Sequence, residues 1–287
     1  MHSADWQLTD DVDDFLARAG DFLRSRRTVH TTWLTLTEKL RTLGVAAHGA
    51  GVPVLGRLER GGEVEAAFFS FPRSRRLTVT ALTSAQADEL AAQLISRGHR
   101  LTGVTGEQDT AAAFADAWQR RTGATSTVRV RIRLRRLGTL TPPDPFPDGG
   151  ARSVGEDDHE HLMSWCRAFA ADVGEEVTID AGSWAGTRFA EKRYTYWQSP
   201  DGTPVSMAGA NPMVAGQVRI DPVYTPSQLR GRGYAGAVTA AVSRAALAAG
   251  ATELVLFTNA ANPTSNALYE RLGYGLVTTF DVYDFTG

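Results

Sequence analysis

A glycine-rich bend at residues 228–235 is the stretch whose residue types most directly indicate chemistry. It reads Gln-Leu-Arg-Gly-Arg-Gly-Tyr-Ala, between a strand-like run at residues 217–224 and an alanine-rich, helix-like segment at residues 235–249. The first amides of a helix have no intrahelical partner and lie at the positive end of the helix dipole. Glycines let such a backbone close around phosphate oxygens, and Arg230 and Arg232 can add charge. The bend therefore predicts a site for a phosphorylated ligand.

Gly231, Gly233 and Gly236 also fit the spacing of a dinucleotide-binding fingerprint. That fingerprint requires an acidic residue about 20 residues further on, at the end of the next strand, to hold the ribose. The next strand-like run, residues 254–258, is followed by Asn259 and not by an acid. The sequence therefore disfavours a nicotinamide or flavin dinucleotide as the ligand.

A second candidate group lies on a short helix downstream. Asn262 followed by Pro263 is typical of a helix start, because asparagine caps a helix well and proline fits its first position. Asn262, Asn266 and Tyr269 follow one another at spacings of four and three, which place them on one helix face. A phenol with a pKa near ~10 keeps its proton at neutral pH and can donate to a thiolate whose parent thiol lies near ~8.5. The spacing alone leaves Tyr269 either as a proton donor or as a core aromatic.

Together these stretches resemble the cofactor region of the GNAT N-acetyltransferase superfamily. The run from Gln228 to Ala235 resembles its Q-x-x-G-x-G pyrophosphate loop, and the resemblance continues through residues 262–266 and 268–274. It implies acetyl-CoA as the acyl donor and Tyr269 as the general acid. The residues that it implies for acetyl-CoA binding are Val223, Tyr224, Thr225, Gln228, Leu229, Arg230, Gly231, Arg232, Gly233, Tyr234, Ala235 and Asn262.

Acetyl transfer from a thioester to an amine needs a neutral amine, a donor to the carbonyl oxygen and a proton for the thiolate. The resemblance assigns the carbonyl oxygen to a backbone amide of residues 223–225, where the strand would separate from its neighbour; the alternative is an ordinary strand. Glu175, Glu176 and Asp221 are candidate bases, although each also fits a solvated surface charge.

A metal site is not expected. His159, Glu160 and His161 lack the H-E-x-x-H spacing, and acids at a helix start suit the helix dipole without any metal. Cys166 lies on an apolar helix face, which is typical of an inert core cysteine.

The overall composition indicates a globular protein of two domains. The chain has 287 residues, which is above the usual size of one domain. Its formal net charge of -2 disfavours general nucleic-acid binding and adhesion to anionic membranes. The single cysteine excludes an intrachain disulfide, and no apolar run reaches the ~18 residues of a membrane helix. The first 14 residues lack the apolar segment of a signal peptide, so we expect a cytoplasmic protein.

Residue periodicity predicts a mixed α/β fold. Predicted helices cover residues 10–26, 33–43, 86–96, 110–121, 160–171, 182–191 and 235–249, and predicted strands cover residues 63–71, 77–82, 101–104, 128–135, 194–198, 205–208, 217–224 and 254–258. Prolines 142, 143, 145 and 147 with Gly149 and Gly150 mark a linker. We therefore predict domains at residues 1–140 and 153–287, joined by a linker at residues 141–152.

The two halves resemble each other. Residues 103–106 followed by a helix at 114–123 parallel residues 256–259 followed by 267–273. Between Leu82 and Gln86, however, only three residues stand where the second half has its glycine-rich bend. The resemblance therefore implies an α/β (α+β mixed sheet) fold of two GNAT-like acyl-CoA N-acyltransferase domains, the first a degenerate copy without a cofactor loop.

Residues 128–135 alternate valine, isoleucine or leucine with arginine, which predicts a strand with one buried and one solvated face. The arginine row either blocks edge pairing or binds an anion.

These patterns predict an N-acetyltransferase that moves an acetyl group from acetyl-CoA to a small-molecule amine by direct attack in a ternary complex. One alternative is a non-catalytic module that binds acyl-CoA or a partner. Another is an acyltransferase with a tRNA-borne donor, suggested only by the arginines at residues 73–76 and 129–136. The acceptor and the oligomeric state are left open.

Overall fold

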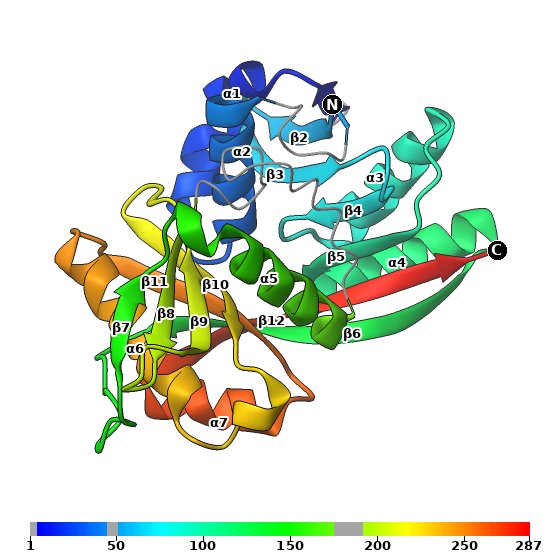
Figure 1. The fold of residues 1–287 in the computed structure, drawn as a ribbon. Coiled ribbons are helices and arrows are strands. Elements are labelled where there is room, and N and C mark those ends of the chain that lie inside the picture. The colour runs from blue at the N-terminus through cyan, green and yellow to red at the C-terminus, as the bar shows by residue number, and fades with distance from the viewer. Residues whose placement is uncertain (1–4, 45–50, 175–191) are drawn as a thin grey trace. The chain divides into compact units, whose positions relative to one another are not determined.

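The computed structural model describes residues 5–44, 51–174 and 192–287, and the chain forms two compact units (Figure 1). The first unit comprises Met1–Leu134, Thr258–Asn262 and Val277–Gly287, and the second comprises Arg135–Phe257 and Pro263–Leu276. Each unit is thus built from segments that are apart in the sequence, whereas the predicted domains, residues 1–140 and 153–287, are continuous. These domain boundaries remain a prediction. None of the helices in the described part is long and apolar enough to cross a membrane.

The first unit is a sheet with helices packed on it. Its elements are β1 (Asp5–Thr9), α1 (Val12–Ser25), α2 (Thr31–Leu43), β2 (Val54–Arg60), β3 (Glu63–Ser70), β4 (Arg76–Val79), α3 (Ser84–Ser96), β5 (Gly103–Glu107), α4 (Gln108–Thr122) and most of β6 (Thr125–Leu137). Strands β1 to β5 are neighbours in sequence order, and the end of β12 (Tyr274–Thr286) pairs with β5. All of these pairs are antiparallel except β4 with β5.

The second unit follows the same plan. Its elements are β7 (Gly150–Ser153), a short 3-10 helix η2 (Glu156–Asp158), α5 (His159–Val173), β8 (Arg193–Gln198), β9 (Pro204–Ala210), β10 (Gln217–Tyr224), the 3-10 helix η3 (Ser227–Leu229), α6 (Tyr234–Ala248), β11 (Glu253–Asn259), α7 (Pro263–Arg271) and the start of β12. Strands β7 to β10 form antiparallel neighbours, and β10 pairs in parallel with β11.

One arrangement recurs in both units. A strand, a helix and a second strand parallel to the first occur as β4–α3–β5 and as β10–α6–β11. In each case a further helix follows, α4 or α7. The repeat predicted from the sequence is therefore confirmed in the order and direction of the elements.

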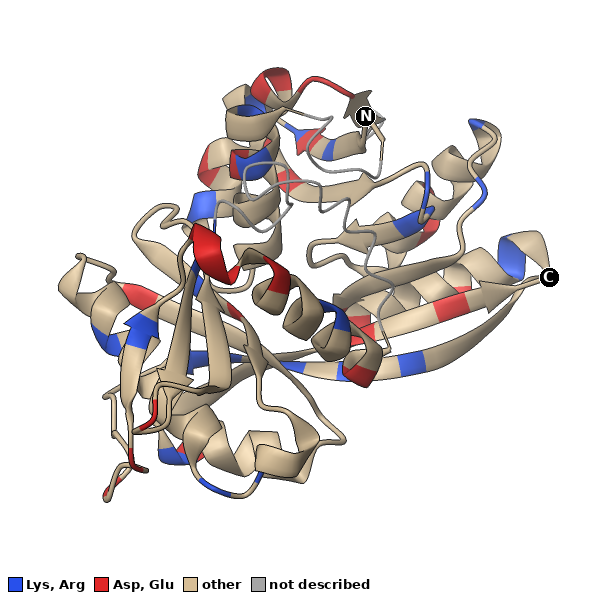
Figure 2. Ribbon diagram, in the orientation of Figure 1, with Lys and Arg blue, Asp and Glu red and all other residues tan. Residues whose placement is uncertain are grey.

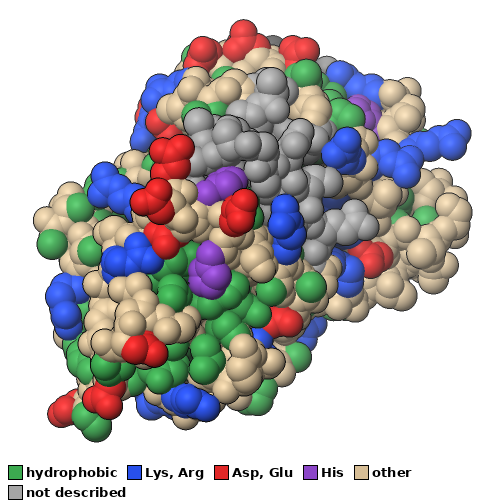
Figure 3. Space-filling view, viewed as in Figure 1, with side chains coloured by type: hydrophobic (Ala, Val, Ile, Leu, Met, Phe, Trp, Pro, Cys, Tyr) green, Lys and Arg blue, Asp and Glu red, His purple; other side chains and the backbone are tan. Residues whose placement is uncertain are grey.

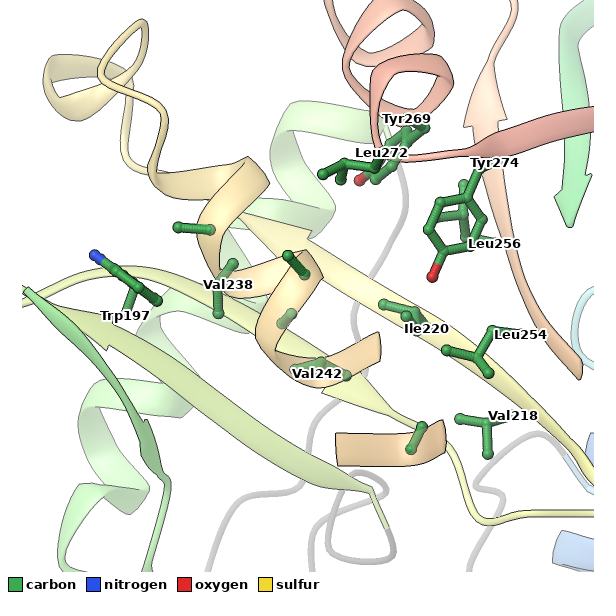
Figure 4. Close-up of a cluster of buried hydrophobic side chains, with 14 of the residues drawn as sticks. Trp197, Val218, Ile220, Val238, Val242, Leu254, Leu256, Tyr269, Leu272 and Tyr274 are labelled. Carbon is green, nitrogen blue, oxygen red and sulfur yellow. The ribbon is translucent and has the colours of Figure 1, made fainter. Parts of the chain in front are cut away.

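The core of the second unit lies on both faces of its sheet. One cluster combines the apolar side of α6 and α7 with β8 to β11, and Figure 4 shows part of it, including Trp197, Val238, Ile220 and Leu256. A second cluster joins α5 to β8 and β9 through buried residues such as Leu162, Cys166 and Tyr196. The helices that carry the candidate site residues are thus fixed by packing and not only by their own hydrogen bonds.

Most elements of the predicted fold are present, and β10 has the predicted bounds. The short strands β1, β2 and β7 and the long strand β12 were not predicted. Pro222 cannot donate to a strand neighbour, so the sequence predicts a bulge or an edge position there, and a register shift between Ile220 and Val223 confirms the bulge. The helix predicted at residues 182–191 lies outside the described residues.

The prediction for residues 128–135 was wrong in one respect. Figure 2 shows the arginines as blue segments along β6. The burial pattern of the strand shows that they do not form a uniform solvated face. Val128 is 44% exposed, whereas Arg135 is only 1% exposed. The guanidinium of Arg135 can be buried because it finds three hydrogen-bond acceptors.

Candidate functional site

The two parallel strands of the second unit separate toward the glycine-rich bend. Pairing of β10 with β11 covers only residues 217–219, opposite residues 253–255. Beyond the bulge at Pro222, Val223 and Tyr224 still pair with Ala208 and Met207 of β9. The end of β10, which carries the predicted residues Val223 and Tyr224, therefore pairs with β9. Within the described chain it has no strand neighbour on the β11 side.

Side chains fix this strand end in place. The hydroxyl of Ser206 donates to the Tyr224 carbonyl at 3.0 Å and lies 2.8 Å from the Thr225 hydroxyl. The Nε of Arg230 donates to the Thr225 carbonyl at 2.9 Å. Ser206 and Thr225 are both buried. The predicted residue Thr225 thus anchors the bend to β9.

The amides at the start of α6 are the most unusual feature of the bend. The backbone N–H groups of residues 231–236 donate to no acceptor in the described part of the chain, and the first amide of the helix that does donate is that of Ala237, to the Gly233 carbonyl at 3.0 Å. Six successive donors at the positive end of a helix dipole form an anion-binding surface. The sequence predicted an anion-binding bend at residues 228–235, and that role of the bend remains a prediction.

Two glycines make this backbone path possible. Gly231 and Gly233 have φ angles of 77° and 82°, in the left-handed region that other residues adopt only with strain. A Cβ at Gly231 would meet no atom within 4 Å, whereas one at Gly233 would lie 3.7 Å from Pro147. The space beside Gly231 is therefore open, and the other glycine lies against the proline-rich segment.

The side chains of the bend differ in exposure. Gln228, Arg230 and Arg232 are exposed, and Leu229, Tyr234 and Ala235 are partly buried. Arg230 forms an ion pair with Asp172 of α5, while Arg232 donates to the Gln228 carbonyl at 3.5 Å. Because Arg230 already has a carboxylate partner, Arg232 is the better placed of the two arginines to neutralise a bound anion.

Tyr269 lies on α7 inside the apolar cluster. It is 7% exposed and packs edge to face against Tyr274, with ring centroids 6.1 Å apart (Figure 4). Burial raises the pKa of its phenol well above the usual range, the Asp221 carboxylate adds to this, and the Thr239 hydroxyl opposes it. The phenol therefore keeps its proton at neutral pH. The packing fits a core aromatic, and the role of Tyr269 as a proton donor remains a prediction.

Asp221, one of the candidate bases, is engaged in an ion pair. Lys192 donates to its carboxylate at 2.9 Å and to its backbone carbonyl at 3.0 Å. The side chain of Lys192 is 9% exposed and that of Asp221 is 43% exposed, so the carboxylate still faces solvent. The other two candidates, Glu175 and Glu176, lie outside the described residues.

Asn262 is exposed in the turn before α7. Its amide donates to the Asn259 carbonyl at 3.0 Å, and the Asn259 side chain accepts from the Ala261 amide at 2.8 Å. Asn262 belongs to the segment Thr258–Asn262, which groups with the first unit. Its role in acetyl-CoA binding therefore remains a prediction, separate from the residues of the bend.

An aromatic cluster beside the strand end was missed in the sequence. The ring centroid of Trp165 on α5 lies 4.5 Å from that of His161, 5.4 Å from that of Tyr196 and 5.8 Å from that of Tyr224. Figure 3 shows hydrophobic side chains (green) gathered where Figure 1 places α5 and strands β8 to β10. The pair His161 and Trp165, four residues apart on one helix, was the available signal, but it could not show that Tyr224 joins them.

The residues considered for a metal have other partners. The Nδ1 of His161 lies 3.0 Å from the Tyr196 hydroxyl, and Asp158 accepts two bonds from Arg152, each at 2.7 Å. Across the described ranges there is no cluster of three or more histidine, cysteine, aspartate or glutamate side chains that could hold a metal ion.

Comparisons with known proteins agree with this geometry. The model of the acetyltransferase (GNAT) family matches residues 159–274. No curated protein matches the sequence. Among solved structures, a tandem GNAT protein from the clavulanic acid biosynthesis pathway has a TM-score of 0.56 at 12% identity, with 98% of each chain covered. A GNAT-family acetyltransferase from Colwellia psychrerythraea has a TM-score of 0.57 at 11% identity and the same coverage.

A third structure, a GCN5-related N-acetyltransferase from Kribbella flavida, has a TM-score of 0.55 at 19% identity and covers 77% of this chain and 87% of its own. At these identities the likeness concerns the fold. The two matches that cover 98% of this chain extend it over both units. The fold is therefore that of two GNAT-like domains. Residues 159–274 are similar to the acetyltransferase (GNAT) family, and the protein is an acyltransferase.

Proposed function

We propose that this protein transfers the acetyl group of acetyl-CoA to the amine of a small molecule, by direct attack while both substrates are bound. The run of amides at residues 231–236 is the observation that carries this proposal. A diphosphate offers several anionic oxygens to such a run, and Arg232 can add a charged contact. We also expect the enzyme to act in the cytoplasm.

The separation of β10 from β11 supports a place for the rest of the donor. A cofactor whose pyrophosphate lies on the start of α6 can send its pantetheine arm along the side of β10 that lacks a strand neighbour. Amides of residues 223–225 on that side can then donate to the thioester carbonyl, as in an oxyanion hole. The bonds from Ser206 and Arg230 hold these residues rigid, which favours such preorganisation.

The proposed reaction requires no covalent enzyme intermediate. The amine lone pair forms the new C–N bond, the C–S bond breaks, and its electrons move to sulfur. The nitrogen proton passes to a base, for which Asp221 is the candidate among the described residues, or to water. The Tyr269 phenol is a weaker acid than a thiol near ~8.5, so it stabilises the leaving thiolate chiefly by donating a hydrogen bond.

The alternative with a tRNA-borne donor has little support. Arg129 and Arg131 lie against Asp284 and Asp281, and Arg135 is buried beside Glu270. The arginine row of β6 is thus largely neutralised, and a polyanion would have to displace these carboxylates.

A direct assay tests the proposal. The protein is mixed with acetyl-CoA and a panel of primary amines, and release of free thiol is followed together with the mass of the acetylated amine. We expect turnover with at least one amine, and thermal protection by acetyl-CoA of roughly 2.7 kcal/mol when its concentration is 100 times Kd. Protection without thiol release would favour the non-catalytic binding module. If saturating acetyl-CoA gave neither protection nor thiol, the proposed cofactor site would be wrong.

A further inference from the structure

We propose that Arg135 is a positioning residue, which holds α7 at the rotation that directs the Tyr269 phenol toward the leaving sulfur. This inference rests on the proposed function. It concerns the one arginine of the predicted row that is buried, a residue to which neither the sequence motifs nor the cofactor bend assigns any role.

The guanidinium of Arg135 ties β6 to α7 and to the strand that follows it. Its Nη2 donates to Asn266 Oδ1 at 3.1 Å and to Glu270 Oε1 at 2.8 Å, and its Nη1 donates to the Tyr274 carbonyl at 3.1 Å. Two of these acceptors lie on α7 itself, and the third lies just beyond its end. All of these residues belong to the second unit.

The two acceptors on α7 flank Tyr269. Asn266 precedes it by three residues and Glu270 follows it directly, so the bonds from Arg135 fix the helix on either side of the phenol. A planar guanidinium with donors in a fixed fork resists rotation of its partners better than a single point charge does. Rotation of α7 about its axis would swing the Tyr269 hydroxyl, and this is the movement that the contact opposes.

The helix needs such a contact because it is short. It spans nine residues, and a helix of this length has little stability of its own in water. Tyr269 on α7 and Leu272 just beyond its end lie in the apolar cluster, while Asn266 is a buried polar residue whose side chain accepts from Arg135. Apolar packing sets the distance of α7 from the sheet, but hydrogen bonds are directional and can set its rotation.

Burial of Arg135 is costly, which argues that the contact does more than fill space. The side chain is 1% exposed, its carboxylate partner Glu270 is 60% exposed, and its Nε has no partner among the described residues. A buried ion pair often adds little net stability compared with apolar residues of the same volume. Arg131 of the same strand, by contrast, is 47% exposed and forms two bonds with Asp281.

Steady-state kinetics of Arg135→Met and Arg135→Lys, each made with and without Tyr269→Phe, test the inference. We expect Arg135→Met to lower kcat about tenfold through misplacement of the donor, with little change in the KM for acetyl-CoA. Arg135→Lys should recover part of the loss. In the Tyr269→Phe background the same substitutions should change kcat less than twofold, because the group they position is already absent. Arg131→Met is the control for loss of an arginine from β6 and should leave kcat unchanged.

Equal effects of Arg135→Met in both backgrounds would overturn the inference and leave the proposed acetyl transfer intact. Absence of thiol release by the wild-type protein would instead count against the proposed function. The two failures are therefore distinguishable.

A milder variant guards against misfolding. Glu270→Gln removes the charge of an exposed partner and should lower kcat by about two- to threefold. It should also speed hydrogen exchange in Pro263–Arg271, with no change in Tyr234–Ala248. Exchange in α7 should also be faster in Arg135→Met, which removes all three bonds. Unchanged exchange there would show that Arg135 does not hold this helix, whatever the activity, and would overturn the inference on its own.

Discussion

Helices α3 and α6 occupy equivalent places in their units, between two parallel strands, yet they begin in different ways. Thr83 caps α3, because its hydroxyl accepts from the Gln86 amide at 3.2 Å and the Gln86 side chain accepts from the Thr83 amide at 2.9 Å. α6 begins after Gly233, which has no side chain to accept a bond. Six amides at its start have no acceptor in the described part of the second unit.

This difference separates a structural helix start from one that can bind a ligand. The capping box satisfies donors of α3 internally, which stabilises the helix but leaves fewer amides for an anion. Gly231 and Gly233 provide no such cap, so the amides at the start of α6 stay available to a ligand. The shared strand–helix–strand plan therefore does not decide which unit binds the cofactor; the few residues between strand and helix do.

The largest expected effect concerns the helix after the second parallel strand. That helix carries the buried aromatic residues Phe114 and Trp118 in the first unit and Tyr269 in the second. Tyr269→Phe makes the second unit resemble the first and removes the proposed hydrogen-bond donor to the leaving thiolate. We expect kcat to fall on the order of 1,000-fold, with a similar KM for acetyl-CoA. Steady-state kinetics of thiol release measure both values.

Tyr274→Phe is the matched control. Its hydroxyl lies 2.7 Å from the Ser243 hydroxyl in the same core, so its loss should cost stability without changing kcat. If the two variants lowered kcat equally, the effect of Tyr269 would be one of packing, and the second unit would differ from the first only at its bend.

Lowering the pH should destabilise the first unit more than the second. His30 in the first unit is fully buried, and burial lowers its pKa to about 4. Its unfolded pKa is near ~6.5, so the unfolded chain binds the proton first as the pH falls. The stabilisation is present above pH 6.5 and is lost toward pH 4, by about 3 kcal/mol in all. Urea denaturation at several pH values measures this loss.

His30→Gln should flatten that dependence, since glutamine does not titrate and can still donate to the Leu23 carbonyl, which lies 3.2 Å from His30 Nδ1. His161→Gln in the second unit is the control. Burial also lowers the pKa of His161, but its side chain is much less enclosed. A steep acid loss that persisted in His30→Gln would place the sensitive group elsewhere.

The sequence predicted the parts of the site that have local signals. The glycines of the bend, the strand that feeds it and the helices on either side are specified by residues close in sequence, so spacing and periodicity suffice. The site of the bulge could also be predicted, because Pro222 cannot donate to a strand neighbour. These features account for β10, the bend, α6 and α7.

The long-range contacts could not be predicted in the same way. Arg135 finds its three acceptors 131 to 139 residues away, and a period-two pattern gives no sign that one arginine of the row is buried. The ion pair of Arg230 with Asp172 spans 58 residues. β12 begins in the second unit and pairs with β5 of the first, so its place depends on the folded chain and not on its own sequence pattern.

A smaller effect should follow when the open helix start is strained. Gly231→Ala puts a side chain at a φ of 77°, which costs roughly 1–2 kcal/mol for a residue in the left-handed region. Relaxation of the backbone should turn amides away from the pyrophosphate and raise the Kd of acetyl-CoA about tenfold. Calorimetric titration measures the change. Gly250→Ala, at a φ of 94° beyond the other end of α6, is a control that should be similarly strained but should leave Kd unchanged.

The smallest effect should come from the capped helix of the first unit. Thr83→Ala removes the acceptor for the Gln86 amide, which should lower the free energy of unfolding by about 1 kcal/mol. Thr83→Ser keeps an acceptor and should lose only a few tenths of that amount. Neither change should alter the Kd of acetyl-CoA, because opening one amide of α3 does not recreate the glycine path that exposes six. A clear change in Kd would mean that the first unit takes part in cofactor binding, and the contrast between α3 and α6 would then have to be abandoned.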